Sequence, residues 1–153
     1  MIFTRDEQAQ IHAQAEAEYP HECCGILLIR RGNPADRLLV RCRNAQDEMH
    51  AKDPEKYPRT ARTAYYIDHK DLLHVGRREA QGYDVAVIYH SHIDVDAYFS
   101  PTDRQNALMT GEPPYPDAVY VVLSVLKGKV ASSAAFAWDA NTRDFVELPP
   151  AAE

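Results

Sequence analysis

The sequence lacks the features of a membrane protein and of a nucleic-acid-binding protein. No apolar run approaches the roughly 18 residues that a bilayer-spanning helix needs, and the N-terminal stretch is too polar for a secretory signal. Lys and Arg (17) are outnumbered by Asp and Glu (23), and they form no basic stripe. Phosphate contacts need clustered basic residues, so nucleic acid is not an expected partner. We expect a cytoplasmic protein that does not bind membranes.

Cysteine is also scarce. The three cysteines, Cys23, Cys24 and Cys42, cannot all pair, and adjacent cysteines are poor partners for each other. A reduced compartment therefore fits best, and we expect the cysteines to be core residues because no activating partner for a thiol is specified nearby. With 153 residues and 45% hydrophobic content, the chain can build its core without disulfides. We expect one domain over residues 1–148 and a short tail over 149–153.

Helix and strand signals follow one another in irregular order along the chain. Thr4 with Glu7 three positions later predicts a capped helix to about Glu18, and Asp68 predicts the start of a second helix over about 69–81. Residues 44–62 hold two prolines and no periodicity, which predicts a long surface loop. Apolar runs predict strands over 23–29, 37–42, 63–67, 85–88, 118–126, 130–138 and 145–148, with turns at 32–34 and 127–129. Such a mixture is typical of an α+β fold with helices packed on a mixed sheet.

Two histidines follow the strand predicted over 85–88. His90 and His92 are one residue apart and therefore lie on the same face of a strand, and Asp103 follows a short distance downstream. Imidazole and carboxylate groups are zinc ligands, and catalytic zinc sites commonly use three protein ligands. The alternative is that the histidines are hydrogen-bonded strand residues, while Ser100 and Asp103 form a capping box for a helix over about 104–109.

The spacing His-x-His, seven residues, Ser-x-x-Asp resembles the motif of the JAMM (MPN-plus) metalloproteases. Glu22-Cys23-Cys24-Gly25 stands where that family has an upstream glutamate, and the resemblance covers roughly residues 4 to 140. It implies an MPN/JAB-like fold, in which a curved, mostly antiparallel sheet is flanked by helices. It also implies one Zn²⁺ per chain.

The same resemblance assigns roles to individual residues. His90, His92 and Asp103 would be the zinc ligands. Glu22 would be the general base, which takes a proton from the attacking water and passes it to the leaving amine. Ser100 would donate a hydrogen bond to the oxyanion that forms on the attacked carbonyl, although plain N-capping by its hydroxyl is the alternative.

The function that this resemblance implies is a zinc-dependent hydrolase that cleaves an amide or isopeptide bond. Compact relatives act on the C-terminal Gly-Gly tails of ubiquitin-like or sulfur-carrier proteins. Because the MPN fold also occurs without metal, a noncatalytic partner-binding scaffold is the main alternative. The sequence does not indicate an oligomeric state.

Asp94 and Asp96 continue the alternation of the two histidines, which also suggests a metallo-β-lactamase-like site. That site needs a histidine where this chain has Val95, and further histidines downstream, of which there are none. We therefore expect Asp94 and Asp96 to lie in a loop and to make the approach to the zinc acidic. Ile93 departs from the proline that many JAMM relatives have after the second histidine.

Overall fold

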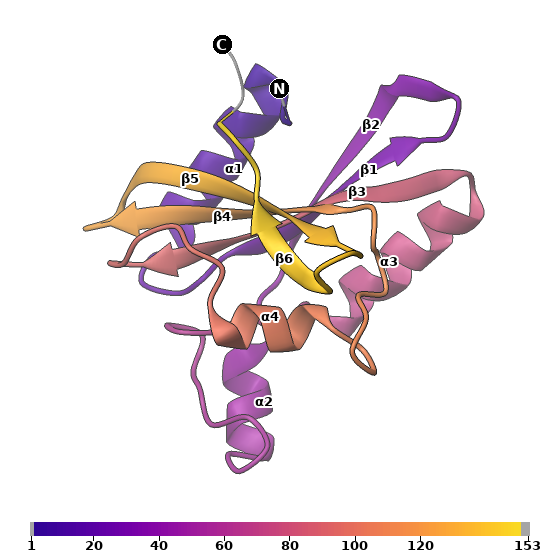
Figure 1. Cartoon of the computed structure of the whole chain (residues 1–153). Helices are drawn as coiled ribbons and strands as arrows, with labels where there is room; N and C mark the ends of the chain where they lie inside the picture. Colours follow the sequence, from indigo (N-terminus) through magenta and orange to yellow (C-terminus); the bar gives the residue numbers. More distant parts are fainter. Residues whose placement is uncertain (1, 151–153) are drawn as a thin grey trace.

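The computed structural model describes residues 2–150, and its centre is a six-stranded mixed sheet with helices on both faces (Figure 1). The strand order is β2-β1-β3-β4-β5-β6; β3 and β4 are parallel, and the other neighbouring pairs are antiparallel. The strands are β1 (Cys24–Arg30), β2 (Asn33–Cys42), β3 (Tyr83–Ile93), β4 (Val119–Leu126), β5 (Lys129–Asp139) and β6 (Asp144–Glu147). The predicted α+β fold with a mostly antiparallel sheet is confirmed.

The alternation of side chains along the strands gives the sheet two apolar faces. One face packs against α1 (Arg5–Glu18), which buries Ile11 and Ala15 there. The other packs against α3 (His69–Ala80) and α4 (Pro101–Ala107), through Val75 and Ala107. In β3, Val87 and Tyr89 belong to the first core and Val85 and Ile88 to the second, so His90 and His92 follow Ile88 onto the α3/α4 face.

Side-chain caps begin the helices where the sequence predicts them. The Thr4 hydroxyl accepts a hydrogen bond from the Glu7 amide, while the Thr4 amide donates to the Glu7 carboxylate. The Asp68 carboxylate likewise accepts from the Lys70 amide at the start of α3. These bonds satisfy amides that have no partner inside the helix, which fixes where each helix starts.

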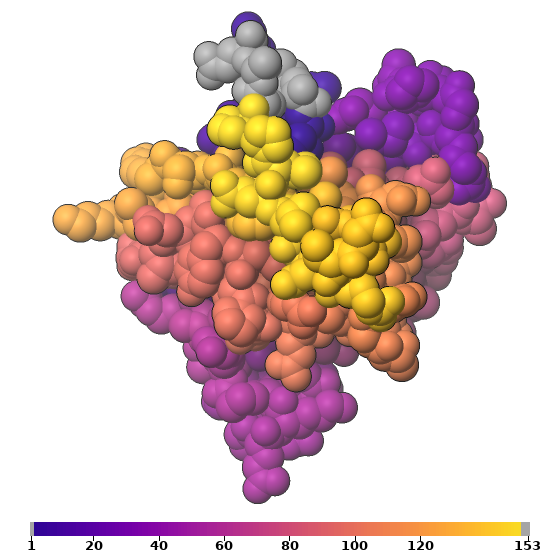
Figure 2. Space-filling view, in the orientation of Figure 1, coloured from indigo at the N-terminus to yellow at the C-terminus, as the bar shows by residue number. Residues whose placement is uncertain are grey.

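Two predictions for the segment between β2 and α3 are wrong. The expected loop over 44–62 contains a helix, α2 (Gln46–Lys52), and this part of the chain projects from the body of the molecule (Figures 1 and 2). The helix has no side-chain cap and buries only Gln46, so it carries neither a start signal nor an apolar stripe. The strand expected over 63–67 is reduced to a single bridge between Asn44 and Ile67.

Smaller differences concern the ends of elements. Asn33 and Pro34 belong to β2, and the hairpin turns at Arg31-Gly32, where Gly32 adopts a φ of 78°. A proline is tolerated there because β2 is an edge strand. Helix α4 starts at Pro101, three residues earlier than expected. Within residues 2–150 no helix has both the length and the apolar character needed to cross a membrane. The single domain over 1–148 and the tail over 149–153 remain predictions, and residues 151–153 lie outside the described part.

Candidate active site

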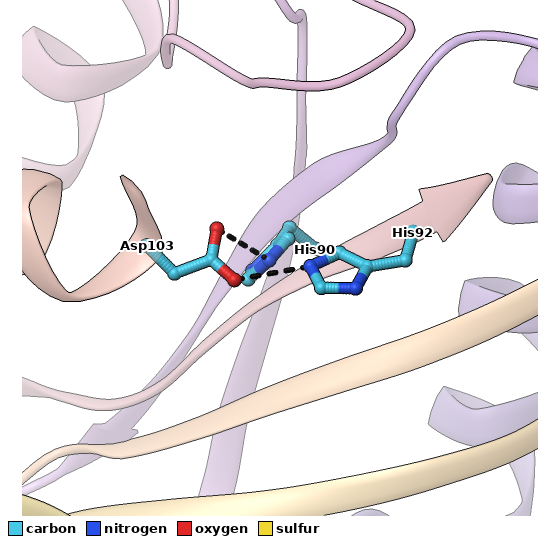
Figure 3. Close-up of side chains that lie close together, drawn as sticks. All are labelled: His90, His92 and Asp103. Carbon is cyan, nitrogen blue, oxygen red and sulfur yellow. Dashed lines mark hydrogen bonds and ion pairs between the residues drawn. The ribbon is translucent and has the colours of Figure 1, made fainter. Parts of the chain in front are cut away.

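Three predicted ligand residues converge on the α3/α4 face of the sheet. His90 and His92 come from the end of β3, and Asp103 comes from the first turn of α4 (Figure 3). The carboxylate of Asp103 lies between the two rings, with Oδ1 3.1 Å from His90 Nε2 and Oδ2 3.0 Å from His92 Nε2 (Figure 3). One ligand atom from each residue lies within 4.8 Å of the others, and all three side chains are buried.

The ionisation of this group suits a cation. Burial lowers the pKa of His90, which keeps its imidazole neutral. Burial also raises the pKa of Asp103, but its contacts with His90 and His92 outweigh that effect, so its pKa lies well below the usual range. Both ring nitrogens of His90 are buried without a hydrogen-bond partner among the described residues, since the contact to Asp103 lacks hydrogen-bond geometry. A neutral, unsatisfied imidazole beside a carboxylate fits a metal ion that takes nitrogen and oxygen ligands.

Asp103 caps α4 with its carboxylate while it faces the two histidines. Its Oδ2 accepts a hydrogen bond from the Ser100 amide at 3.0 Å, and its own amide donates to Ser100 Oγ at 3.0 Å, which completes a capping box. Oδ1 takes no part in the cap, so the capping box leaves one carboxylate oxygen of Asp103 for a ligand role. Ser100 Oγ is an acceptor in this box, so its hydroxyl proton is left for another partner.

Glu22 lies two residues before β1. Residues on either side of α2 hydrogen-bond both its backbone amide and its backbone carbonyl. Its amide donates to Ala61 O at 2.8 Å, and Asn44 Nδ2 donates to its carbonyl at 2.8 Å. The side chain is 4% exposed, and Oε1 has no hydrogen-bond partner among the described residues. Burial, and then the charge of Asp103, raises the pKa of Glu22 to about 9. A cation bound beside it would act in the opposite direction.

A cleft of about 220 Å³ brings three of the five predicted site residues together. Its walls include Glu22, His92 and Ser100, and it opens to solvent beside the loop that follows β3. The remaining lining residues are Arg59, Arg62, Thr63, Ile93, Val95, Tyr98, Pro101 and Thr102. A larger hollow of about 550 Å³ includes Ile11, Val121 and Leu123, which belong to the core on the α1 face of the sheet. That hollow is therefore separate from the histidine site.

Two tyrosines that the sequence does not single out pack on the histidine rings. Tyr65 stacks on His90 with a ring-centroid distance of 4.5 Å and an interplanar angle of 25°. Tyr98 meets His92 edge-on at 4.9 Å. His92 Nδ1 also lies 3.1 Å from the Asp96 carbonyl oxygen. These contacts fix the orientation of both rings so that each Nε2 points at Asp103.

Asp94 and Asp96 lie in the loop after β3, as expected, whereas their effect on the charge of the approach to the site stays a prediction. Neither carboxylate is among the residues that line the cleft. Asp94 has a φ of 57° and accepts hydrogen bonds from the Tyr19 hydroxyl at 2.7 Å and the Lys127 amide at 2.8 Å. These two bonds tie the loop that follows β3 to Tyr19 and to the turn at Lys127. The cleft lining itself carries the positive charges of Arg59 and Arg62.

The cysteines are core residues, as expected. Cys23, Cys24 and Cys42 are free and buried. Burial raises the pKa of Cys23 and of Cys42 to about 12, and it moves the pKa of Cys24 in the same direction. A thiol in this environment is not a nucleophile at neutral pH.

Comparison with known proteins agrees with the geometry of this site. Residues 4–141 match the family described as prokaryotic homologs of the JAB domain. The chain belongs to this family. It is 33% identical over 125 residues to the CysO-cysteine peptidases of Mycobacterium tuberculosis and Mycobacterium bovis, covering 81% of this chain and 73% of each relative. The metallo-β-lactamase alternative is therefore wrong.

Two solved structures resemble this JAB-family protein along most of its length. A solution structure of a protein from Salinibacter ruber is 29% identical and has a TM-score of 0.59. One from Desulfitobacterium hafniense is 18% identical, has a TM-score of 0.64 and shows the fold alone. Each alignment covers 95% of this chain and 87% of the other. Family membership and the His-His-Asp group together support a hydrolase of the JAMM type.

Proposed function

We propose that this protein is a zinc metallopeptidase that cleaves the amide or isopeptide bond after the Gly-Gly tail of a ubiquitin-like or sulfur-carrier protein. The observation that carries the proposal is the convergence of His90, His92 and Asp103 in a buried group whose His90 nitrogens have no hydrogen-bond partner within residues 2–150. A noncatalytic scaffold would have no use for this unsatisfied arrangement, because buried polar groups without partners cost free energy.

His90, His92 and Asp103 would hold the ion. A zinc ion bound there would supply a Lewis acid and lower the pKa of water, which produces a nucleophile at neutral pH. Asp103 is fixed by its capping box, and the histidine rings by Tyr65 and Tyr98, so the three side chains need little rearrangement to bind the ion.

Two residues of the cleft would act on the substrate. Glu22 would accept a proton from the attacking water and return it to the leaving amine; its Oε1 is free to do so because no group in the described part of the chain bonds to it. Ser100 Oγ accepts from the Asp103 amide, so its own proton could be donated to the oxyanion that develops on the scissile carbonyl.

The dimensions of the cleft favour a tail of small residues. A volume of about 220 Å³ leaves little room for bulky side chains around the reacting bond. An extended Gly-Gly segment presents only its backbone and can therefore enter a narrow site. The name of the mycobacterial relatives, CysO-cysteine peptidase, supports a substrate of the sulfur-carrier kind.

Metal content and hydrolysis of a tailed carrier test the proposal. Protein purified without chelator should contain one zinc ion per chain and should hydrolyse a Gly-Gly-tailed carrier conjugate. His92→Ala should lose most of its zinc because two protein ligands rarely retain the ion. The control is His74→Ala, a change on α3 that leaves the three ligands intact. Absence of metal, together with failure to bind added zinc, would leave the scaffold alternative.

A further inference from the structure

We infer that Arg59 and Arg62 form a subsite in the cleft that binds the α-carboxylate of a leaving amino acid. The inference rests on the proposed function and adds the residues that would select the leaving group. It predicts removal of one C-terminal residue in preference to cleavage of a bond to a lysine side chain.

Both arginines belong to the cleft and have donors to spare. Arg59 is exposed, and its guanidinium makes no hydrogen bond or ion pair with any group in residues 2–150. Arg62 has one long contact of 3.5 Å, to Asp94 Oδ2. That carboxylate is already bonded to Tyr19 and Lys127, and the Arg62 side chain remains 55% exposed. Most of the N–H groups of both side chains are therefore available to a ligand.

The sign of the charge identifies the ligand chemistry. The protein carries a net charge of -6, yet the only Lys or Arg side chains among the described residues that line the cleft are these two arginines. Arginine presents paired N–H groups whose spacing matches a carboxylate, and such charge-assisted bonds are the stronger kind. A neutral peptide tail has no group that would use two guanidinium ions, whereas a terminal carboxylate does.

The position relative to Glu22 places this carboxylate on the leaving group. The charge of Arg59 reaches Glu22, where it opposes the effects of burial and Asp103 on the pKa of that residue. Glu22 is the proposed proton donor to the leaving amine, and in an amino acid a single carbon separates that nitrogen from the α-carboxylate. A carboxylate bound by Arg59 and Arg62 would therefore lie beside the base. In a lysine isopeptide the carbons next to the amine are apolar and offer the arginines nothing.

Paired peptides measure the selectivity directly. One labelled tail peptide ends in Gly-Gly-Ala with a free carboxylate, the second is its C-terminal amide, and the third joins Gly-Gly to the Nε of N-acetyl-lysine amide. Binding is measured with the zinc-loaded Glu22→Gln protein, which does not consume the peptides, and kcat/KM is measured with the unaltered enzyme. The free acid should be preferred over the other two by roughly tenfold to a hundredfold, the value of charge-assisted hydrogen bonds.

The arginine variants decide whether the subsite is responsible. Arg59→Gln/Arg62→Gln should lose the preference for the acid while binding the amide as before, and Arg77→Gln on α3 should keep it. If the double variant still prefers the acid, the carboxylate contacts the metal and the inference is wrong. Equal affinity of the unaltered cleft for acid and amide would also overturn it. If inorganic phosphate displaces the acid peptide more readily than alanine does, the site is one for phosphate. Failure of all three peptides to bind or react would instead overturn the proposed function.

Discussion

Ser91 and Cys23 join the strand of the proposed ligands to the residue that follows the proposed base. Ser91 Oγ accepts a hydrogen bond from the Cys23 amide at 2.7 Å, and the Ser91 amide donates to the Cys23 carbonyl at 3.1 Å. Ser91 stands between His90 and His92, and Cys23 follows Glu22. The small side chain between the two histidines therefore sets the position of Glu22 relative to the ligand group.

Ser91→Ala should destabilise the protein and reduce turnover without removing the metal. The change leaves the Cys23 amide without a partner in the core, which should lower the free energy of unfolding by about 1–3 kcal/mol. Urea denaturation measures this loss. Ser132→Ala, on the exposed part of β5, should change stability by no more than about 0.5 kcal/mol. Equal effects of the two changes would mean that the Ser91 bond contributes nothing.

The elements that sequence predicts well are those with a local cause. The capping boxes at Thr4 and Ser100 and the buried strand before His90 follow from short-range hydrogen bonding and from alternation, both of which can be read in a few residues. Helix α2 has no such signal, because Ala45 at its N-cap makes no side-chain bond. The strand expected over 63–67 does not form because the Asn44 side chain takes the Tyr66 amide and the Ala64 carbonyl.

The residues of the proposed site also differ in whether a local sequence signal points to them. His90, His92 and Asp103 are predicted from the spacing of the motif that carries the resemblance, and Glu22 from the Cys-Gly context that follows it. Arg59 and Tyr65 reach the site only through the fold of the segment around α2, and their local sequence holds no pattern that points to it. Asp94 follows the end of β3 at Ile93, in the loop where the sequence places it, but its positive φ and its bonds to Tyr19 and Lys127 have no local sequence signal.

Asn44 should behave as a positioning residue for Glu22. Its Nδ2 donates to the Glu22 and Ala64 carbonyls, and its Oδ1 accepts from the Gln46 and Tyr66 amides. Asn44→Asp keeps the size and the acceptor but loses the donor. We expect kcat to fall while zinc content and the pH profile of metal binding stay unchanged, because the three ligands are untouched. A variant that lost zinc in proportion to activity would show only general damage to the fold.

The Glu7–Arg37 pair should give the protein part of its stability above acidic pH. Arg37 donates to both Glu7 oxygens at 2.7 and 2.8 Å, and the side-chain hydrogen bond from Arg37 lowers the pKa of Glu7 below its usual 4.5. A lowered folded-state pKa means that the contribution is complete above about 4.5 and is lost as the pH falls through the folded value.

Glu7→Gln should therefore be less stable near neutral pH by about 1–2 kcal/mol and lose less on acidification. Denaturation midpoints across the acid range measure both effects. Asp6→Asn, a change at an exposed residue in the same turn of α1, is the control and should keep the acid dependence of the parent. A parent and a Glu7→Gln variant with parallel pH curves would contradict the assignment.

The buried thiols should be unreactive in the folded protein and dispensable for turnover. Burial raises the pKa of Cys23 and Cys42 to about 12, so little thiolate forms near neutral pH. A chromogenic disulfide should titrate three thiols only after unfolding. Cys42→Ala should cost stability within the usual 0.5 to about 3 kcal/mol of a core change and keep its activity per folded molecule. Loss of activity with intact fold and zinc would indicate thiol chemistry.

Glu22→Gln should separate the base from the ligands. Glutamine keeps the size of the side chain but cannot accept a proton, so hydrolysis should fall by about 10²–10⁴-fold, the usual loss for general acid–base catalysis. Zinc content should stay at the parent value because His90, His92 and Asp103 form the ligand group without Glu22. Stability should not fall, since burial alone already disfavours the charged form and raises the pKa of Glu22 to about 9 in the absence of a cation. Glu55→Gln, an exposed change in the segment after α2, is the control for both measurements. Turnover at the parent rate would make Glu22 a bystander, whereas loss of zinc would make it a ligand. With both results as expected, the inactive protein keeps its cleft and becomes a trap for a Gly-Gly-tailed partner.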